Sequence, residues 1–298
     1  MKIKKIRKRM WKKFALWFAM RVGFSVGKRR VRLLSDNQAN EALLKRLRSK
    51  APLMVCRYGG TEFSVLIGKN GANALSLLSG FFPEDEQLIP KFCALYKEDS
   101  FQIDVLGIWI LLGAWKRFIK KKVWLKNYPN IQEIVSLSVI SPSGTGGPNW
   151  LYKGLEGKRV LVVHPFKNSI ESQLPKWDEL GRLPLWESVE IFAAVQTLAD
   201  QNDDRFETWF DALEYMKKEI ERRTFDVCLV GCGAYGFPLA AHVKRLGKQA
   251  IHIGGALQLM FGIKGGRWEN RPFDEHWIRP LSSDRPKGAE KVEEGCYW

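Results

Sequence analysis

Residues 226–255 read DVCLVGCGAYGFPLAAHVKRLGKQAIHIGG, and this stretch decides the fold. A β-branched apolar run leads into a glycine-rich turn, then a helical pattern and a second apolar run that ends in two glycines. Gly231, Gly233 and Gly236 have the G-x-G-x-x-G spacing at the point where a strand should pass into a helix. The pattern predicts a βαβ unit whose glycines allow a tight turn and close approach of a ligand, with a helix N-terminus directed at an anion.

The same stretch does not favour a nicotinamide cofactor. A dinucleotide-binding unit usually has Asp or Glu at the end of its second strand, to bind the ribose hydroxyls. Here residues 250–253 are followed by Gly254 and Gly255, with no acidic residue in reach, and Pro238 lies in the first helical turn. The motif therefore indicates an α/β ligand site without naming the ligand. The alternative is a glycine-rich turn that serves only close packing.

Length and composition set the outer limits. The chain has 298 residues, 45% hydrophobic and 27% charged, which is enough for a substantial core in one large α/β domain or two small ones. The five cysteines are scattered, and no C-x-x-C pair occurs. An odd, scattered set does not favour a disulfide framework or a zinc site, so we expect reduced thiols and a cytoplasmic location.

The basic charge is concentrated at the N-terminus. Residues 1–35 hold 13 Lys and Arg and no Asp or Glu, which leaves +3 of the net +16 for the rest of the chain. Within this arm Trp11, Phe14 and Phe18 recur at helical spacing among basic residues. A basic amphipathic helix with aromatic side chains on one face suits an anionic membrane surface. We therefore expect residues 1–35 to be a membrane-association arm at the inner face of the membrane.

Three alternatives for the arm stay open. Its apolar part is interrupted by Arg21 and is too short to span a bilayer, although the order of basic and then apolar residues also occurs in signal peptides. The helix would otherwise dock on the protein's own body or bind nucleic acid. A second basic cluster at 116–126, KRFIKKKVWLK, either joins the arm on lipid headgroups or is a solvated face.

The rest of the chain alternates between helical and strand patterns. The spacing of apolar residues predicts strands over 53–58 and 158–164 and helices over 37–50, 62–67, 84–98, 187–198 and 206–223, the second helix capped by Thr61. This alternation predicts a Rossmann-like, mostly parallel sheet with helices on both faces. We expect residues 36–298 to form a single domain, with a possible internal boundary at the flexible stretch 141–149, SPSGTGGPN.

Polar or glycine-rich sequence follows four of the expected strands, at 57–62, 164–169, 231–236 and 252–258. Ligands in open α/β sheets bind beyond the carboxyl ends of the strands, so we expect these segments to converge. The candidates for acid–base chemistry are Glu62, His164 and His252. The candidates for binding a nucleotide diphosphate are Arg57, Tyr58, Gly59, Lys167, Ser169, Gly231, Gly233, Tyr235, Gly236, Gly254, Gln258, Lys264 and Trp268.

Each candidate also has a purely structural interpretation. His164 ends a strand, where it would bond a neighbouring loop, and His252 would be a satisfied core histidine. A carboxylate at Glu62 would favour the positive end of a helix dipole. The glycine-, arginine- and tryptophan-rich tail, at 261–268 and 295–298, suits a lid over a sugar or an anion, or aromatic packing onto the core.

The segment RYGGTEF at 57–63 and the I-x-I-G turn at 251–254 resemble the GT-D type glycosyltransferases, over roughly residues 50–265. The motifs VLVVHPF, GCGAYG, FGIKGGRW and GCYW are similar to uncharacterised bacterial proteins encoded among polysaccharide-synthesis functions. The resemblance implies a Rossmann-like fold and a nucleotide-sugar donor, for which a UDP-sugar is the expected class. It also implies a D-x-E motif, within R-[FY]-G-D-G-E, that binds a metal ion and the donor diphosphate.

This chain departs from that motif. Arg57, Tyr58, Gly59 and Glu62 match it, but Gly60 stands where the family has the aspartate and Thr61 where it has a glycine. One remaining carboxylate is a poor site for Mn²⁺ or Mg²⁺, because hard cations take several oxygen ligands. Three possibilities follow: Glu62 binds a metal with help from elsewhere, Arg57 and Lys167 neutralise the diphosphate instead, or catalysis has been lost.

The resulting expectation is a glycosyltransferase that moves a sugar from a nucleotide-sugar donor to a polysaccharide or lipid-linked acceptor at the inner membrane surface. The alternative is a non-catalytic, membrane-associated protein that binds a nucleotide or a sugar nucleotide. Nucleic-acid binding through the arm and the 116–126 cluster is the weakest interpretation, since no recognition motif accompanies the charge.

Overall fold

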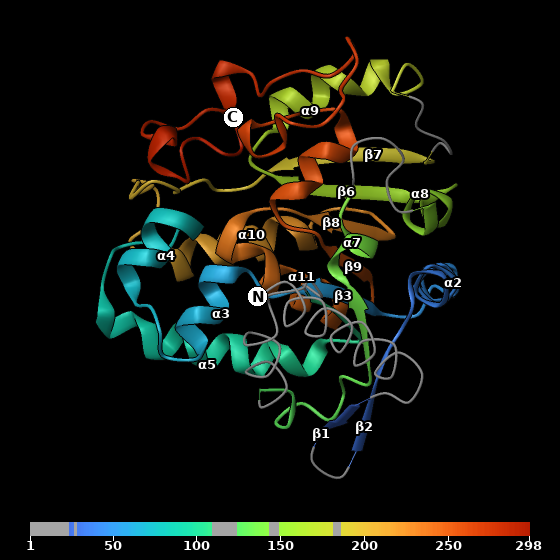
Figure 1. Ribbon diagram of the computed structural model, residues 1–298. Helices are drawn as coiled ribbons and strands as arrows, with labels where there is room; N and C mark the ends of the chain where they lie inside the picture. The colour runs from blue at the N-terminus through green and yellow to red at the C-terminus, as the bar shows by residue number, and fades with distance from the viewer. Residues whose placement is uncertain (1–23, 27–28, 109–123, 143–148, 181–185) are drawn as a thin grey trace, which may run out of the picture.

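The computed structural model describes residues 24–26, 29–108, 124–142, 149–180 and 186–298. Within these residues, nine strands form one sheet in the order β1-β2-β5-β4-β3-β9-β8-β6-β7 (Figure 1). The strands are β1 (Phe24–Val26), β2 (Arg29–Leu33), β3 (Leu53–Arg57), β4 (Val105–Ile108), β5 (Glu133–Ser136), β6 (Arg159–His164), β7 (Ser188–Ala193), β8 (Val227–Val230) and β9 (Gln249–His252). Only β1 runs antiparallel to its neighbour among these described strands, so the expected mostly parallel α/β fold is confirmed.

The helices follow the strands along the chain. They are α2 (Asp36–Arg48), α3 (Gly60–Leu66), α4 (Ala72–Ser79), α5 (Ile89–Asp99), α7 (Leu137–Ile140), α8 (Asn149–Leu155), α9 (Lys167–Gln173), α10 (Trp209–Glu221) and α11 (Gly236–Arg245). Short 3₁₀ turns are η1 (Glu86–Leu88), η2 (Ser100–Gln102), η3 (Leu174–Lys176), η4 (Gly233–Tyr235), η5 (Gly255–Phe261), η6 (Gly266–Trp268), η7 (Ser282–Asp284) and η8 (Ala289–Lys291). Helix α3 begins after Gly59, without a side-chain cap, so the prediction that Thr61 caps it is wrong.

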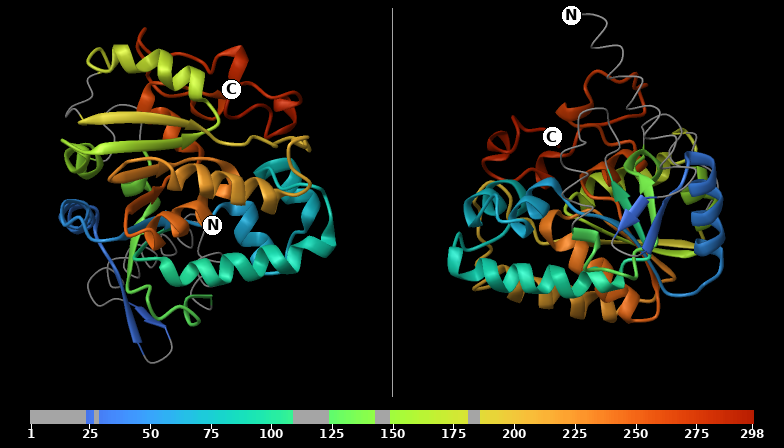
Figure 2. Two further views of the ribbon diagram at one scale, coloured as in Figure 1. Left: turned by 180° about the vertical axis from the view of Figure 1, so that it is seen from behind. Right: turned by 60° about the horizontal axis from the view of Figure 1, so that its bottom comes forward.

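Helices cover both faces of the sheet, as the sequence predicts. Because successive side chains of a strand point to opposite faces, Met54 and Cys56 of β3 join one core cluster while Leu53 and Val55 join the other. The first cluster includes residues of α5, α10 and α11, and the second includes residues of α2, α8 and α9. Figure 2 shows these helices on either side of the strands. Strands buried on both faces are continuous apolar runs, which is the pattern that the sequence shows.

The predicted helix over 187–198 is wrong, because residues 188–193 form strand β7. This strand pairs in parallel with β6 through six residues, from Arg159 opposite Ser188 to His164 opposite Ala193. Among the described residues, β7 lies at the edge of the sheet and pairs only with β6. Of its six side chains only those of Ile191 and Phe192 are buried. A short apolar run is compatible with both the helical period of 3.6 residues and the strand period of two, so the pairing with β6 decides its conformation.

The N-terminal segment contributes to the sheet. Residues 24–26 and 29–33, which fall within the arm expected from the charge pattern, form β1 and β2, and β2 pairs with β5. Residues 1–23, including the aromatic positions of the expected amphipathic helix, lie outside the described residues, as do 116–123 of the second basic cluster. Among the helices that are described, none combines the length and the apolar character needed to cross a bilayer.

The sheet also continues across the expected internal boundary. Strands β5 and β6 lie on either side of residues 141–149 in the chain and belong to the same sheet, while residues 143–148 are not described.

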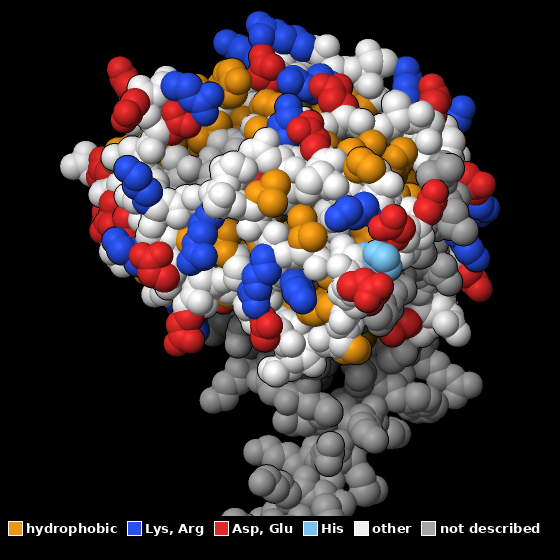
Figure 3. Space-filling view, turned by 90° about the horizontal axis from the view of Figure 1, so that it is seen from above, with side chains coloured by type: hydrophobic (Ala, Val, Ile, Leu, Met, Phe, Trp, Pro, Cys, Tyr) orange, Lys and Arg blue, Asp and Glu red, His pale blue; other side chains and the backbone are white. Residues whose placement is uncertain are grey.

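After β9 the chain forms a C-terminal segment, residues 255–298, built mostly of 3₁₀ turns and loops. Asp284 fixes it to α9, since the backbone N–H and the hydroxyl of Ser169 both donate to this carboxylate at 2.6 Å. Further along, the N–H of Gly266 donates to the Trp298 carbonyl at 3.2 Å. Figure 3 views the molecule from above and shows basic and acidic side chains interspersed over that face, with hydrophobic side chains between them.

Candidate functional site

A cavity of about 280 Å³ lies where β3, β6, β8 and β9 end. Its walls come from separate parts of the chain: the β3–α3 turn, the ends of α4 and β4, the segments after β6 and β7, the turns after β8 and β9, and the C-terminal segment. The predicted site residues that line it are Arg57, Tyr58, Gly59, Glu62, His164, Gly231, Gly233, His252, Gly254 and Gln258. The four segments expected to converge therefore do meet at one cavity.

The register of the sheet explains this convergence. Val163 of β6 pairs with Val230 of β8, and Val230 pairs with His252 of β9. One strand further, Ile251 pairs with Val55 of β3. The four neighbouring strands thus end at about the same level, and residues at or just after each strand end line the same cavity.

Glu62 lies in the first turn of α3 and folds back over the N-terminal end of this helix. A Cβ atom built on Gly59 would lie 1.8 Å from Glu62 Oε2, so the carboxyl group occupies the space that a side chain at position 59 would take. Burial raises the pKa of Glu62, while its own backbone N–H, the charge of Arg57 and the Ser79 hydroxyl act in the opposite direction. A buried carboxyl group with a raised pKa is a candidate for proton transfer at this site.

Arg57 ends strand β3, and its guanidinium lies against the turn after β9. A Cβ atom on Gly254 would lie 3.1 Å from Arg57 Nη1, and a Cβ atom on Gly255 would lie 2.2 Å from the ring of Tyr297. The two consecutive glycines therefore leave room for Arg57 and Tyr297 side by side at the cavity wall.

His164 is a neutral hydrogen-bond donor in this structure. Its Nδ1 accepts a hydrogen bond of 3.0 Å from the Phe166 backbone N–H, which assigns the ring proton to Nε2. Burial lowers the pKa of His164 to about 3, so the imidazole stays neutral at physiological pH. Since the ring lines the cavity, it suits donation from Nε2 to a ligand oxygen better than removal of a proton.

His252 is also buried and neutral. Burial, assisted by the positive charge of Arg57, lowers its pKa to about 3. Its ring packs on α11, where a Cβ atom on Gly236 would lie 2.5 Å from His252 Nε2. His252 thus lines the cavity on one side and packs against α11 on the other.

The G-x-G-x-x-G glycines mainly let protein groups approach one another. A Cβ atom on Gly231 would lie 2.8 Å from the Gly254 carbonyl oxygen, and one on Gly233 would lie 2.6 Å from the Ser79 carbonyl oxygen. Gly236 makes room for His252 in the same way. Gly231 and Gly233 still line the cavity, but their missing side chains are explained by packing alone.

Six predicted site residues lie away from the cavity lining: Lys167, Ser169, Tyr235, Gly236, Lys264 and Trp268. Lys167, one of the two cations expected to bind the diphosphate, begins α9 and pairs with Glu171 at 3.6 Å along the helix surface. Ser169 is fully buried and is bonded to Asp284. Both residues follow β6, one of the strands that end at the cavity, but in helix α9 their side chains contact Glu171 and Asp284 and do not reach the cavity.

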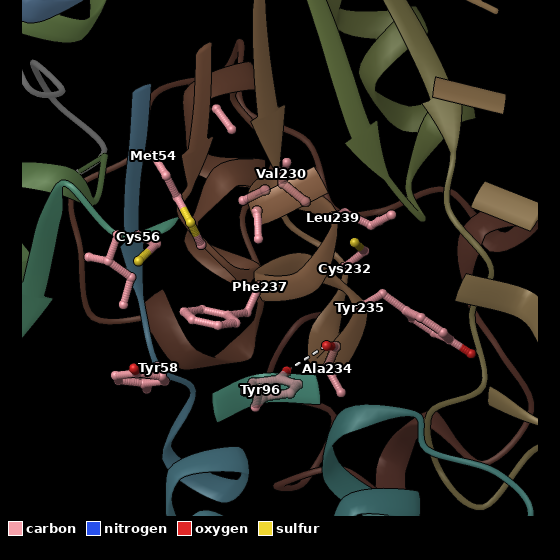
Figure 4. Packing of buried hydrophobic residues seen from close by; sticks show 14 of the residues in the cluster. Met54, Cys56, Tyr58, Tyr96, Val230, Cys232, Ala234, Tyr235, Phe237 and Leu239 are labelled. Carbon is pink, nitrogen blue, oxygen red and sulfur yellow. Dashed lines mark hydrogen bonds between the residues drawn. The ribbon is translucent and has the colours of Figure 1, made fainter. Parts of the chain in front are cut away.

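The aromatic candidates belong to the core. Tyr235 stacks on Trp209 at 5.0 Å between ring centroids, and its hydroxyl lies 3.3 Å from that of Thr197. Tyr58 stacks on Phe237, and its hydroxyl is bonded to the Ser100 hydroxyl at 2.5 Å. Figure 4 shows Tyr58 and Tyr235 among these buried side chains. Tyr58 therefore lines the cavity with its hydroxyl already in use.

The two tail stretches for which the sequence allows a lid or aromatic packing, 261–268 and 295–298, contribute to the cavity wall, but Lys264 and Trp268 do not. Lys264 lies 5.5 Å from the ring centroid of Phe273, and Trp268 is buried in a small cluster with Leu259 and Trp277. The tail residues that line the cavity are Arg267, Glu293, Tyr297 and Trp298. The sequence indicated the segment, but turn geometry decides which of its side chains face inward.

Gln258 supports this wall. It is fully buried, and its amide nitrogen donates to the Tyr297 carbonyl at 3.0 Å. Its predicted role in donor binding is therefore accompanied by a structural one.

The donor set of the cavity does not fit a divalent cation. Its lining contains two carboxylates, Glu62 and Glu293, and Glu293 pairs with Arg267. Among the described residues there is no group of three or more His, Cys, Asp or Glu placed to hold a metal ion. Mg²⁺ takes six oxygen ligands, of which one or two are protein carboxylates, whereas Glu62 is buried against Gly59 and Glu293 is paired with Arg267. We derive no metal-dependent step from this arrangement.

Comparisons with known proteins bear on the fold. Neither protein-family models nor curated proteins match the sequence. A solved structure described as a new glycosyltransferase from Streptococcus sanguinis, with a domain of unknown function 1792, is 15% identical, with a TM-score of 0.50. The match covers 86% of this chain and 96% of that one. A second structure, described as this domain with a distinct glycosyltransferase fold, is 16% identical over 85% of this chain and 92% of that one, with a TM-score of 0.48. The chain thus adopts an α/β fold similar to that of the Streptococcus sanguinis glycosyltransferase.

Proposed function

We propose that the protein is a glycosyltransferase that moves a sugar from a nucleotide-sugar donor, with a UDP-sugar as the expected class, to a polysaccharide or lipid-linked acceptor. One observation carries the proposal: Glu62, Arg57 and His164 line one cavity at the carboxyl ends of neighbouring parallel strands. Ligands of open α/β sheets bind at this edge. The likeness in fold to a solved glycosyltransferase agrees with this assignment.

Glycosyl transfer makes two demands on the site. The bond between the anomeric carbon and the diphosphate oxygen breaks, which leaves negative charge on the diphosphate, and the acceptor hydroxyl loses its proton as it bonds to that carbon. In our proposal Arg57 binds the diphosphate, and the Glu62 carboxylate takes the proton. A raised pKa makes the Glu62 carboxylate a stronger base than an exposed glutamate.

His164 adds a neutral donor to this arrangement. Its Nδ1 is occupied by the Phe166 N–H, so the proton on Nε2 is directed to a ligand oxygen. A fixed donor of this kind stabilises developing charge without a reorganisation cost.

The test is turnover of a panel of nucleotide sugars with saccharide and lipid-linked acceptors, with and without Mn²⁺. Glu62→Gln is expected to lower kcat/KM by about 10²–10⁴-fold, because the variant has no base at this position. Glu207→Gln, which changes an exposed glutamate, is the matched control. Undiminished turnover in Glu62→Gln removes this residue from the mechanism, and an absence of turnover throughout the panel removes the enzyme assignment.

A binding-only protein is the second candidate, and one observation favours it. Gly60 stands where the resembling family has its aspartate, and the position faces open space at the cavity. A site that lost a catalytic ligand would retain nucleotide binding. Tight nucleotide binding without turnover, across the same panel, supports this candidate over the first.

The proposed place of action is the inner membrane surface. It rests on the basic and aromatic pattern of residues 1–23, which suits anionic lipid headgroups. Flotation with anionic vesicles tests it: the full chain is expected to float, and a chain lacking residues 1–23 is expected to stay behind. Equal flotation of the two chains excludes this role.

A further inference from the structure

We propose that Arg57 and Arg267 hold the donor diphosphate together without a divalent cation, and that the diphosphate displaces Glu293 from Arg267. The inference rests on the proposed nucleotide-sugar site and names the groups that recognise its charged part. It keeps Arg57 and replaces Lys167, the second cation expected from the sequence, with a residue of the C-terminal segment.

Two arginines reach the cavity from opposite ends of the chain. Arg57 comes from β3 and Arg267 from η6, and both line the cavity. Tyr297 lies near both charges: burial raises its pKa, while the charges of Arg267 and Arg57 act in the opposite direction. Arg267 Cζ lies 4.6 Å from the centroid of the Tyr297 ring, and its Nη1 donates to the Tyr297 hydroxyl at 3.2 Å.

The acidic residues of the cavity favour this arrangement over a metal ion. Glu62 is buried against Gly59, with Ser79 and its own N–H as partners, and Glu293 is already paired with a cation. The D-x-E motif of the resembling family has a second carboxylate two positions before its glutamate, and this chain has Gly60 there. A planar guanidinium group can donate two parallel hydrogen bonds to two oxygens of one phosphate. Two arginines can therefore supply the positive charge that a metal ion would otherwise bring.

Glu293 holds Arg267 in an exchangeable pair. The two side chains are 56% and 36% exposed, and exposed ion pairs contribute little to stability. Glu293 and Glu294 have φ values of 45° and 58°, in the left-handed region that residues other than glycine seldom adopt. This turn places the Glu293 carboxylate beside Arg267 at the cavity wall. A diphosphate has more oxygen atoms and more negative charge than this carboxylate, so it can take the place of Glu293 as the partner of Arg267.

The experiment measures binding of nucleoside diphosphates to the full chain by calorimetry, in EDTA and in Mn²⁺, with UDP, GDP, ADP and CDP as probes. We expect at least one to bind, with affinities in the two conditions that agree within about twofold, a difference well below the tenfold that 1.4 kcal/mol represents. Binding that requires Mn²⁺ overturns this inference and leaves the proposed function standing. No binding in either condition overturns both.

Two substitutions have opposite expected effects. Arg267→Ala is expected to weaken binding about tenfold or more, through loss of charge-assisted hydrogen bonds. Glu293→Gln is expected to strengthen it about two- to fivefold, because it removes a weak competing pair. A variant that merely unfolds cannot bind more tightly, so the second substitution keeps the test decisive.

Arg271→Ala is the matched control, since Arg271 is an exposed arginine of the same segment that lies outside the cavity lining. Its affinity is expected to equal that of the wild type. Equal affinity in Arg267→Ala, or weaker binding in Glu293→Gln, contradicts the inference.

Discussion

The guanidinium of Arg57 lies against Gly254, so close that a Cβ atom at position 254 would come within 3.1 Å of Nη1. Gly254 also has a φ of 77°, a conformation that glycine adopts without strain. One glycine thus performs two tasks: it turns the chain after β9, and it leaves space for the cation of the site. The I-x-I-G turn noticed in the sequence has a physical reason in this contact.

Gly254→Ala is therefore expected to lose both stability and nucleotide binding. Gly254 has a φ of 77° and a ψ of −160°, a backbone conformation that is essentially restricted to glycine, so a Cβ atom there costs about 1–3 kcal/mol, and the new methyl group pushes Arg57 from its position. Gly247→Ala separates the two effects, because Gly247 has a φ of 78° and no atoms in the space that its Cβ would fill. Thermal unfolding should show a loss of stability in both variants, while calorimetry should show weaker binding only for Gly254→Ala. Equal binding in the two variants would mean that the position of Arg57 is irrelevant to the ligand.

Glu62 should destabilise the protein at neutral pH. Burial raises its pKa in the folded state, so the folded protein binds a proton more readily than the unfolded chain does. The contribution of Glu62 to the free energy of unfolding therefore falls as the pH rises from the pKa of the unfolded state to the pKa of the folded state. At still higher pH this contribution stays at its lower value. Glu62→Gln is expected to unfold at a higher temperature than wild type at pH 8, with this advantage disappearing at acid pH. Melting curves from pH 4 to pH 8 check the sign, with the exposed Glu207→Gln as control.

Gly60→Asp should convert the site to one that responds to metal ions. Gly60 lines the cavity, a Cβ atom there would meet no other atom within 4 Å, and Glu62 is two positions away. A second carboxylate at this position restores the D-x-E spacing of the resembling family, which hard cations favour. Calorimetric titration with Mn²⁺ is expected to give measurable binding for Gly60→Asp and none for Gly60→Ser, which adds a side chain without a carboxylate. Identical titrations for the two variants would show that the departure at this position has no bearing on metal binding.

The sequence predicted the sheet and the edge that carries the site for a clear reason. Parallel strands buried on both faces are continuous apolar runs, and the polar residues that follow them must meet beyond their carboxyl ends. Arg57, Glu62, His164 and His252 each follow or end such a run, and all four line the cavity. Helix α10 was equally predictable, because its apolar stripe has the helical period.

The same reasoning does not predict contacts between residues that are far apart in the sequence. Strand β7 was predicted as a helix, since nothing in its apolar spacing reveals the six-residue pairing with β6. Lys167 was expected in the site, yet its side chain lies along the surface of α9 beside Glu171. Arg267 belongs to a segment of turns without periodicity, where the sequence does not tell which side chain faces inward. The sequence therefore indicates the tail, while the structure shows that Arg267 of this segment lines the cavity and Lys264 does not.

The two buried histidines should make the protein sensitive to acid. Burial lowers the pKa values of His164 and His252 to about 3, whereas an unfolded histidine titrates near 6.5. Below about pH 6.5 the unfolded state binds more protons than the folded state, so each group reduces stability by up to about 1.4 kcal/mol for every pH unit. His164→Gln removes one of these groups, and its stability deficit relative to wild type is expected to shrink as pH falls from 7 to 4.

Val163→Ala, a substitution beside His164 that removes no titrating group, is the control for this measurement. Its deficit is expected to stay constant over the same range, because its cost comes from lost packing. Denaturant unfolding at each pH gives both values directly. A deficit for His164→Gln that is constant with pH would show that the imidazole is already charged, or accessible to water, in the folded protein, and the assignment of a neutral Nε2 donor would then fail.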